Sequence, residues 1–254
     1  MEAYTDFAGV YDAFMDETPY EEWKKRLLEI CDEYNLREGL GVDLGCGTGI
    51  MTELLSQSGF DMIGIDNSNE MLSKAIAKKE DKNLNILYLC QDMREFELYG
   101  TVKVIFSICD CMNYLLEPNE IIQVMKLANN YLDPQGCFIF DFNTLHKYKD
   151  IIGDTTIAEN RDDCSFIWEN YFYEEDHINE YELTLFLKDQ SVKNDVIYRK
   201  STEIHYQRGY TLEEITQYAK MSGLKVLAAY DEYSKQPANE NSERILMVLQ
   251  EQGK

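Results

Sequence analysis

The stretch "VDLGCGTGI" (residues 42–50) places three glycines, Gly45, Gly47 and Gly49, at alternate positions directly behind an apolar run. Such a loop between a strand and a helix lets backbone N–H groups approach a ligand closely, because glycine carries no Cβ. The dinucleotide-binding fingerprint G-x-G-x-x-G would need its third glycine at position 50, where this chain has Ile50. The loop therefore indicates a nucleoside site, and its spacing argues against a nicotinamide dinucleotide.

Strand-like and helix-like patterns alternate along the first 143 residues. Each expected strand is nearly continuous in apolar residues, which is typical of a parallel sheet covered by helices on both faces. In the doubly wound sheet that this order favours, ligands bind beyond the carboxyl ends of the strands, where the glycine loop lies. We expect strands at residues 40–44, 60–66, 84–90, 102–109 and 136–142, and helices at residues 20–34, 48–59, 68–79 and 118–132.

The pattern changes after residue 150. Alternation of apolar and polar residues predicts three antiparallel strands, at residues 164–173, 178–188 and 195–207. A helix with a capping box of Thr211 and Glu214, and then two closing strands, are expected at residues 211–223, 224–232 and 244–250. We therefore predict an α/β fold with a doubly wound, mostly parallel seven-stranded sheet, built from residues 1–150 and 209–254, and a small antiparallel β subdomain inserted at residues 151–208.

The composition limits the classes of partner and compartment. With 24 basic and 47 acidic residues, the net charge of −23 would repel a polyphosphate backbone, so we expect no nucleic-acid partner. Seven cysteines, an odd number, favour a reducing compartment over a disulfide framework. The lone C-x-C of Cys109 and Cys111 lacks a second pair, so no metal site is predicted. The acidic start is unlike a signal peptide and no apolar run is long enough for a bilayer, which together predict a cytoplasmic chain.

Two acidic residues follow the next two predicted strands. Asp66 ends the strand at 60–66, where a carboxylate can accept hydrogen bonds from both hydroxyls of a ribose. Asp92 follows the strand at 84–90, where it can accept from an exocyclic amine, with Met93 beside it as an apolar wall for a base. The loop, the ribose acid and the base acid thus end three successive strands, and that order supports a nucleoside site more strongly than any single member.

Three stretches, "VDLGCGTG" (42–49), "GIDNS" (64–68) and "QDMREF" (91–96), resemble the signature motifs of class I S-adenosylmethionine-dependent methyltransferases. The opening "FAGVYDAFM" (7–15) and "PYEEW" (19–23) resemble the helical lid of the small bacterial branch of that family. The resemblance implies a Rossmann-like methyltransferase fold with S-adenosylmethionine as cofactor. The antiparallel insertion is similar to that of the sugar-amine N-methyltransferases.

The same resemblance implies a set of cofactor-binding residues. Asp66 would hold the ribose hydroxyls and Asp92 would meet the adenine amine. Asp43 and the glycine loop would face the methionine and ribose parts, while Tyr11 and Trp23 would help to close the pocket. The implied residues are Tyr11, Trp23, Asp43, Gly45, Cys46, Gly47, Thr48, Gly49, Asp66, Asn67, Met71, Asp92, Met93 and Cys109.

Polar residues after the fourth and fifth strands are expected near the reacting groups. "CDCMNY" (109–114) brings Asn113 and Tyr114 to the mouth of the site, and "FNTLH" (142–146) brings His146, the candidate base. We predict catalytic roles for His146, Asn113 and Tyr114. The segment after the fourth strand lacks the Pro-Pro-Tyr motif of the amide methyltransferases, which argues against the DNA- and glutamine-methylating branches.

These observations predict an enzyme that moves a methyl group from S-adenosylmethionine to nitrogen or oxygen of a small molecule by in-line displacement. The alternative is a module that binds S-adenosylmethionine as a sensor or structural ligand without turnover, because the cofactor motifs fit it equally well. A nicotinamide-dependent dehydrogenase would need the longer glycine spacing and would leave Asp92 unexplained.

Overall fold

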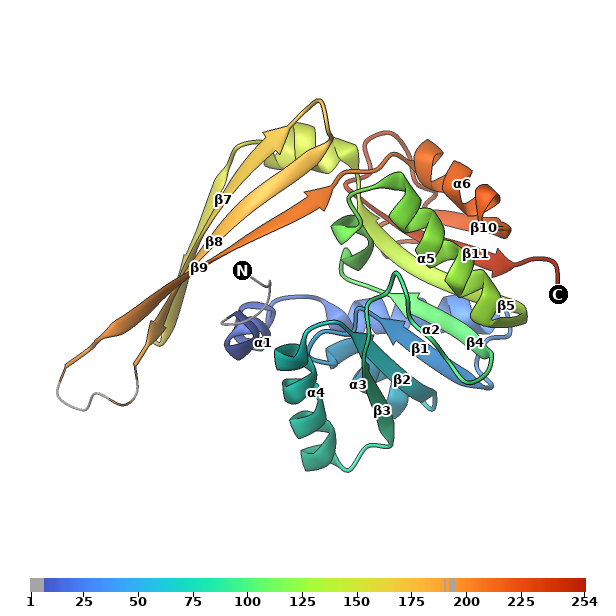
Figure 1. The fold of residues 1–254 in the computed structure, drawn as a ribbon, viewed down its shortest axis with the longest axis horizontal. Coiled ribbons are helices and arrows are strands. Elements are labelled where there is room, and N and C mark those ends of the chain that lie inside the picture. Colours follow the sequence, from blue (N-terminus) through green and yellow to red (C-terminus); the bar gives the residue numbers. More distant parts are fainter. Residues whose placement is uncertain (1–6, 190, 192–194) are drawn as a thin grey trace.

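The structure, a computed structural model, describes residues 7–189, 191 and 195–254 (Figure 1). Its main sheet has seven strands in the order β10-β11-β5-β4-β1-β2-β3. Strands β1 to β5 run parallel, and β11 runs antiparallel to its neighbours β5 and β10. The predicted doubly wound, mostly parallel sheet is therefore confirmed. The strands are β1 Leu40–Leu44, β2 Asp61–Asp66, β3 Ile86–Cys90, β4 Val102–Ser107, β5 Leu132–Asn143, β10 Leu224–Asp231 and β11 Arg244–Glu251.

The direction of winding reverses between β1 and β4. The chain moves outward from β1 through β2 to β3 and then returns to form β4 on the other side of β1. In the register, Asp43 of β1 lies beside Gly64 of β2 and Phe106 of β4, so the carboxyl ends of all three strands meet at one edge. Such a reversal opens a crevice beyond the strand ends, which is where doubly wound sheets bind ligands.

Within the described residues, five helices of eight or more residues cover the main sheet, and their termini follow local sequence signals. Ser68 caps one helix by accepting a 3.2 Å hydrogen bond from the backbone N–H of Met71. Thr211 and Glu214 form the predicted reciprocal capping box. None of the helices in the described ranges has both the length and the apolar character that a membrane span requires. The helices are α2 Tyr20–Glu33, α3 Ile50–Gln57, α4 Asn69–Lys82, α5 Pro118–Tyr131 and α6 Leu212–Met221.

Alternate residues of each strand enter two separate hydrophobic cores, one on each face of the main sheet. In β11, Ile245 and Met247 join the core beneath α5 and α6, whereas Leu246 and Val248 join the core beneath α2 and α3. All four side chains are at most 1% exposed. A strand whose residues are buried on both sides reads as a continuous apolar run, which explains the sequence pattern of these strands.

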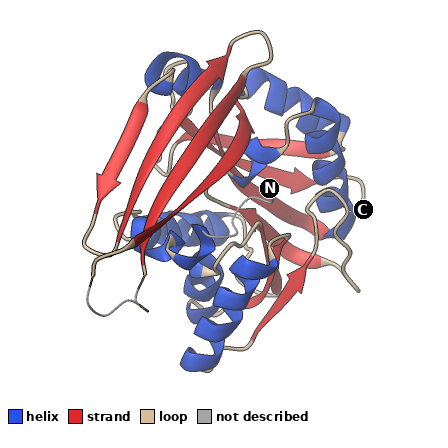
Figure 2. Ribbon diagram, turned by 60° about the vertical axis from the view of Figure 1, so that its left-hand side comes forward, coloured by secondary structure: helices blue, strands red, loops and turns tan. Residues whose placement is uncertain are grey.

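The inserted region forms a second, antiparallel sheet in the order β6-β7-β8-β9, which Figure 2 shows as a layer apart from the main sheet. Its strands are β6 Thr156–Asn160, β7 Cys164–Tyr173, β8 Ile178–Lys188 and β9 Tyr198–Arg208. The three predicted strands are confirmed. Strand β6 was not predicted, because it is short and mostly exposed and therefore lacks a clear alternation. The division into 1–150 with 209–254 and 151–208 stays a prediction.

The four-residue helix α1 (Tyr11–Phe14) lies between the two sheets and is called the lid here. On one side the lid contacts the inserted sheet, where Phe14 packs edge-on against Phe166 with ring centroids 4.8 Å apart. On the other side Asp12 accepts hydrogen bonds from Lys78 of α4, at 2.7 Å, and from Thr48 of the glycine loop, at 2.5 Å. The lid therefore bridges the crevice of the main sheet and the inserted sheet.

Candidate active site

A cavity of about 480 Å³ opens at the carboxyl ends of β1, β2, β3 and β4, beneath the lid. This volume lies within the range of sites for small molecules and cofactors, about 300–1,000 Å³. The described residues that line the cavity come from the lid, the start of α2, the ends of β1 and β2, the glycine loop, the start of α4 and the segments after β3 and β4. Among them are Tyr11, Tyr20, Asp43, Gly45, Cys46, Gly47, Thr48, Asp66, Asn67, Met71, Asp92, Met93, Arg94, Cys109, Cys111 and Tyr114.

The glycines of the loop serve different purposes. Gly47 lines the cavity with φ of +53°, and a Cβ built on it would meet no atom within 4 Å. A Cβ on Gly45 would come within 2.7 Å of the Cys111 sulfur, and one on Gly49 would collide with the Tyr88 hydroxyl. Gly45 and Gly49 thus allow neighbouring side chains to pack closely, whereas Gly47 leaves open space on the ligand side.

Asp43 lies at the floor of the cavity near the end of β1 and is only 2% exposed. Its carboxylate accepts a 2.5 Å hydrogen bond from the Thr52 hydroxyl of α3. Burial raises the pKa of Asp43 to about 6, the nearby Asp66 adds to the rise, and the Thr52 hydrogen bond opposes it. A carboxylate that is shielded from solvent in this way attracts a nearby cation strongly.

Asp66 ends β2 and is fixed by two backbone donors. One oxygen accepts a 2.7 Å hydrogen bond from the N–H of Gly47, and the other accepts a 2.9 Å bond from the N–H of Ser68. Burial raises the pKa of Asp66, and these backbone hydrogen bonds oppose the rise. The acid is thereby tied to the glycine loop, and each oxygen retains a further lone pair for a hydroxyl donor.

Asp92 lines the cavity after β3 and forms an ion pair with Arg94, a residue that was not predicted from the sequence. The Arg94 guanidinium donates to both carboxylate oxygens, with the shortest distance 2.6 Å, and also reaches Glu120 of α5 at 2.7 Å. These hydrogen bonds lower the pKa of Asp92 below its ordinary value, so the carboxylate is ionised and held in place. Arg94 lies in the cavity wall beside it.

The turn after β4 is strained and is held by a buried ionic network. Cys109 and Asp110 both have positive φ, 72° and 52°, which non-glycine residues rarely adopt. Asp141 of β5 accepts a 2.7 Å hydrogen bond from the Asp110 N–H, and Arg244 of β11 bridges the carboxylates of Asp110 and Asp141 at 2.7 and 2.9 Å. The network fixes the backbone that presents Cys109 to the cavity.

The three residues predicted to be catalytic lie in different surroundings. Tyr114 lines the cavity. Asn113 is fully buried, and its side-chain amide bonds the backbone of Asn143 and the carbonyl of Arg208, so its polar atoms are engaged in holding two segments together. His146 lies outside the lining that the described residues form and contacts Asp150 at 2.8 Å. The geometry therefore brings Tyr114 to the cavity and does not bring the other two.

Two of the predicted cofactor residues also lie outside that lining, Trp23 and Gly49. Trp23 stacks on Tyr233, with ring centroids 4.7 Å apart, and lies under the Arg244 guanidinium. Gly49 starts α3 against Tyr88 and Ala75. The other predicted cofactor residues line the cavity together, although they come from six separate segments of the chain.

Comparison with known proteins identifies the family. The methyltransferase domain model matches residues 42–136. A protein of Geobacillus sp. strain WCH70 that is named as a methyltransferase is 32% identical over 247 residues, covering 96% of this chain and 98% of its own. The chain belongs to the class I S-adenosylmethionine-dependent methyltransferases. It is an enzyme, and S-adenosylmethionine is its cofactor.

Solved structures of methyltransferases agree in fold over the whole length of the chain. An S-adenosylmethionine-dependent methyltransferase from Clostridium acetobutylicum ATCC 824 superposes with a TM-score of 0.88 at 29% identity, covering 99% of this chain and 100% of that one. The amino pentose methyltransferase CalS10 from Micromonospora echinaspora, with bound S-adenosylmethionine, gives a TM-score of 0.71 at 15% identity, covering 99% and 98%. The second likeness shows a shared fold over nearly the whole of both chains.

The residues that line the cavity of this methyltransferase suit its cofactor in the space they leave and in their charge. Gly47 leaves the space that a Cβ would occupy open, and the acids Asp43, Asp66 and Asp92 line the cavity with it. A sulfonium and an amino group are cationic, while ribose hydroxyls and an adenine amine are donors, so acceptor side chains suit all of them.

Three further residues of the wall, Tyr20, Arg94 and Cys111, were not predicted from the sequence. Tyr20 and Cys111 lie inside the quoted stretches "PYEEW" (19–23) and "CDCMNY" (109–114), but neither carries a chemical signal of its own. Arg94 lies inside the quoted stretch "QDMREF" and could have been found there as the partner of Asp92.

Proposed function

We propose that this methyltransferase moves the methyl group of S-adenosylmethionine to a nitrogen or oxygen of a small-molecule acceptor by in-line displacement. The observation that carries the proposal is a cavity shared by the predicted cofactor residues and by Tyr114, with the lid across it. A space of about 480 Å³ beneath a lid suits a cofactor and a small acceptor rather than a folded macromolecule.

The positions of the acids support individual roles for them. In this proposal Asp66 accepts hydrogen bonds from the ribose hydroxyls, Asp92 accepts from the adenine amine, and Asp43 attracts the cationic methionine end. Asn67, Met71 and Met93 flank the base, while the backbone of residues 45–48 and the side chain of Cys109 complete the wall. Tyr11 of the lid closes the cavity, and burial raises its pKa well above the ordinary value, so its hydroxyl stays neutral.

The chemical contribution of the protein is mostly to orient and to exclude water. When bound, S-adenosylmethionine supplies a methyl group on a positively charged sulfur, which is already activated toward nucleophiles. The cavity wall holds the acceptor opposite the departing sulfur, and such alignment can supply roughly 7–11 kcal/mol of the barrier in favourable cases. The lid keeps water from the reacting atoms.

The net charge of the protein supports a neutral or cationic acceptor, and its free cysteines support a reducing compartment. A net charge of −23 disfavours anionic acceptors and nucleic acid, so we favour a neutral or cationic small molecule. CalS10, which shares the fold, is described as an amino pentose methyltransferase, and an amino sugar is one acceptor of this kind. All seven cysteines lie in the described ranges as free thiols, which suits a reducing cytoplasm.

The test of this function is a transfer experiment. The protein is incubated with methyl-labelled S-adenosylmethionine and a fractionated metabolite extract, and labelled products are identified by mass spectrometry. We expect S-adenosylhomocysteine and one labelled small molecule in equal amounts. Label found only in protein or nucleic acid fractions would overturn the small-molecule proposal.

Asp66→Ala should weaken S-adenosylmethionine binding by about 1–3 kcal/mol, or roughly 5–150-fold, because the ribose hydroxyls lose their acceptor. The loss also frees the N–H of Gly47, which Asp66 binds at 2.7 Å. Asp61→Ala is the matched control, since Asp61 is exposed at the opposite end of the same strand. Calorimetry measures both affinities, and equal affinity of the folded Asp66→Ala variant would contradict the assignment.

The affinity for S-adenosylmethionine should fall as the pH falls through about 6. In the unliganded protein the pKa of Asp43 is about 6 because the carboxylate is buried, and the nearby Asp66 adds to the rise. A bound sulfonium favours the ionised carboxylate and lowers that pKa, so affinity is nearly full from about pH 7 upward and falls as the pH drops through 6, by up to about tenfold at pH 5. S-Adenosylhomocysteine lacks the sulfonium charge and should show a smaller change. Titration calorimetry of both compounds from pH 5 to 8, with Asp43→Asn as control, measures the difference.

A further inference from the structure

Two buried, ionisable residues of the inserted sheet, His205 and Glu203, lie near Tyr114. His205 of β9 has its Nδ1 3.2 Å from the Tyr114 hydroxyl, and its Nε2 lies 3.4 Å from a carboxylate oxygen of Glu203 on the same strand. Both side chains are at most 2% exposed. Burying a carboxylate and an imidazole is costly, so their placement side by side against a residue of the cavity wall calls for a role.

The surroundings fix the orientation of the imidazole ring. Tyr181 of β8 stacks on His205 with ring centroids 4.7 Å apart and an angle of 6°, and Trp168 of β7 packs against Tyr181 at 4.6 Å. The Tyr181 hydroxyl also lies 2.6 Å from the Tyr114 hydroxyl. Neighbouring strands thus hold the ring of His205 in one plane, with one nitrogen toward Tyr114 and the other toward Glu203.

This orientation favours one tautomer of His205. A carboxylate accepts hydrogen bonds, so the relay places the hydrogen on Nε2, the ring nitrogen that lies 3.4 Å from Glu203 without forming a hydrogen bond to it in this structure. Nδ1 then presents a lone pair to the hydroxyl of Tyr114, which can donate to it. A proton placed on Nδ1 would form an imidazolium beside Glu203, and the nearby carboxylate stabilises that charge in a dry environment.

We propose that Glu203 and His205 form a proton relay through Tyr114. In this relay Tyr114 takes the proton from the molecule that receives the methyl group. The proposal rests on the proposed function, because Tyr114 must face an acceptor whose nitrogen or oxygen carries a proton. Tyr114 contacts the acceptor, whereas His205 and Glu203 act through Tyr114 as positioning residues. The inserted sheet thereby contributes to the chemistry as well as to the shape of the site.

The relay balances protons and electrons. The lone pair of the acceptor forms a bond to the methyl carbon, the carbon–sulfur bond breaks, and its electron pair stays on sulfur. The acceptor loses its proton to the Tyr114 oxygen while the Tyr114 proton moves to Nδ1 of His205. The imidazolium and Glu203 then form an ion pair, which returns its proton to water when the product leaves. No oxidant, metal or further reactant is needed.

The tautomer of His205 tests the geometry without any acceptor. The chain has three histidines, so ¹⁵N-histidine NMR of the wild type and of His205→Gln assigns the His205 resonances directly. We expect protonated Nε2 and bare Nδ1, with the Nδ1 resonance moving toward its free value in Tyr114→Phe and the tautomers mixing in Glu203→Gln. A protonated Nδ1, or an Nδ1 shift unchanged by Tyr114→Phe, would overturn the relay.

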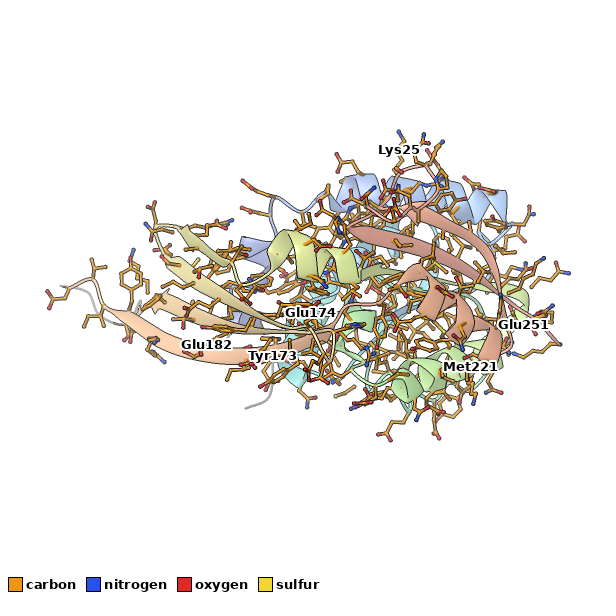
Figure 3. All side chains as sticks on the ribbon, turned by 90° about the horizontal axis from the view of Figure 1, so that it is seen from above. Lys25, Tyr173, Glu174, Glu182, Met221 and Glu251 are labelled. Atoms are coloured by element: carbon orange, nitrogen blue, oxygen red, sulfur yellow. The ribbon has the colours of Figure 1, made fainter. Side chains whose placement is uncertain are left out.

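Matched controls come from the opposite face of the same sheet. Glu182 pairs in register with Ile204, which is 45% exposed, and Tyr206 is 43% exposed. Figure 3, which labels Glu182, shows side chains projecting from both sides of these strands. Glu182→Gln and Tyr206→Phe should leave the His205 resonances unchanged, because neither side chain faces the ring.

Kinetics with the acceptor found in the transfer experiment test the proton step. His205→Gln should lower kcat about 100-fold, a usual contribution of acid–base catalysis, while the Kd of S-adenosylmethionine changes less than twofold. Tyr114→Phe should lower kcat by a similar factor, and combining it with His205→Gln should add little further loss, because the residues act as one unit. An unchanged kcat in His205→Gln refutes the relay. Failure of the wild type to transfer any label refutes the proposed function, whereas the NMR measurement tests the relay independently of turnover.

Discussion

Arg244→Ala should lower the free energy of unfolding by about 3–5 kcal/mol, the usual cost of removing one partner from a buried ion pair. Arg244 is the counter-charge of Asp141, which is fully buried, and of Asp110. Burial alone would raise the pKa of Asp110, but the charges of Arg244 and Lys147 lower it. Without the guanidinium, two carboxylates would remain close together with little solvent, and the strained turn at Cys109 and Asp110 would lose its support.

Chemical denaturation at pH 7 measures this effect, with Arg37→Ala as the matched control. Arg37 also makes a two-point ion pair, with Asp32 at 2.7 and 3.1 Å, but its side chain is 34% exposed and that of Asp32 is 63% exposed. Exposed pairs contribute about 0–1 kcal/mol, so the control should lose little. Similar losses of unfolding free energy in the two variants would show that the Arg244 network stabilises the protein no more than an exposed ion pair does.

Gly47→Val should abolish measurable cofactor binding, with a loss of at least about 100-fold, while the protein stays folded. Because Gly47 lines the cavity and its Cβ would meet no protein atom within 4 Å, we expect the added side chain to occupy ligand space. A branched side chain also resists φ of +53°, at a cost of roughly 1–2 kcal/mol.

A substitution at a second glycine separates the effect of backbone strain from the effect of filling the ligand space. Gly59 follows α3, has φ of +100° and likewise has no atom within 4 Å of a built Cβ, but it lies outside the described lining of the cavity. Gly59→Val should therefore lose stability in thermal unfolding and keep its affinity for S-adenosylmethionine in calorimetry. If both variants lose affinity equally, the loop at 45–49 is not where the cofactor binds.

Much of the fold could be predicted because its strands are buried on both faces. The strand at 40–44 is predicted to the residue, and the others agree within a few residues, since a continuous apolar run bounded by turns is a strong local signal. The short helix at 111–114, the π-helix at 147–152 and the strand β6 were not predicted. Tertiary contacts with β5, β9 and β7 hold these segments, and their own sequences carry little periodicity.

The candidate site could be predicted only where it follows a strand end. Asp43, Asp66 and Asp92 each stand at such an end, so the parallel topology alone brings them to one edge. His146 also follows a strand, yet it stands directly before a π-helix, contacts Asp150 on that helix and is not among the described residues that line the cavity. The pairing of Tyr114 with His205 joins residues 91 positions apart through the inserted sheet, and local sequence patterns do not encode such a contact.

Two ion pairs that water can reach help to hold helix α1, one from Asp12 within the helix and one from Asp16 just beyond its end. The Asp12–Lys78 and Asp16–Arg161 pairs have carboxylates that are 44% and 56% exposed, and each such pair contributes at most about 1 kcal/mol. Detaching this short segment breaks these pairs, the hydrogen bond to Thr48 and the contact of Phe14 with Phe166, which are far fewer interactions than either sheet contains. Rising ionic strength screens both ion pairs and should speed the exchange of S-adenosylhomocysteine for S-adenosylmethionine. We therefore expect the turnover of this enzyme to depend on salt through the helix that covers its cavity.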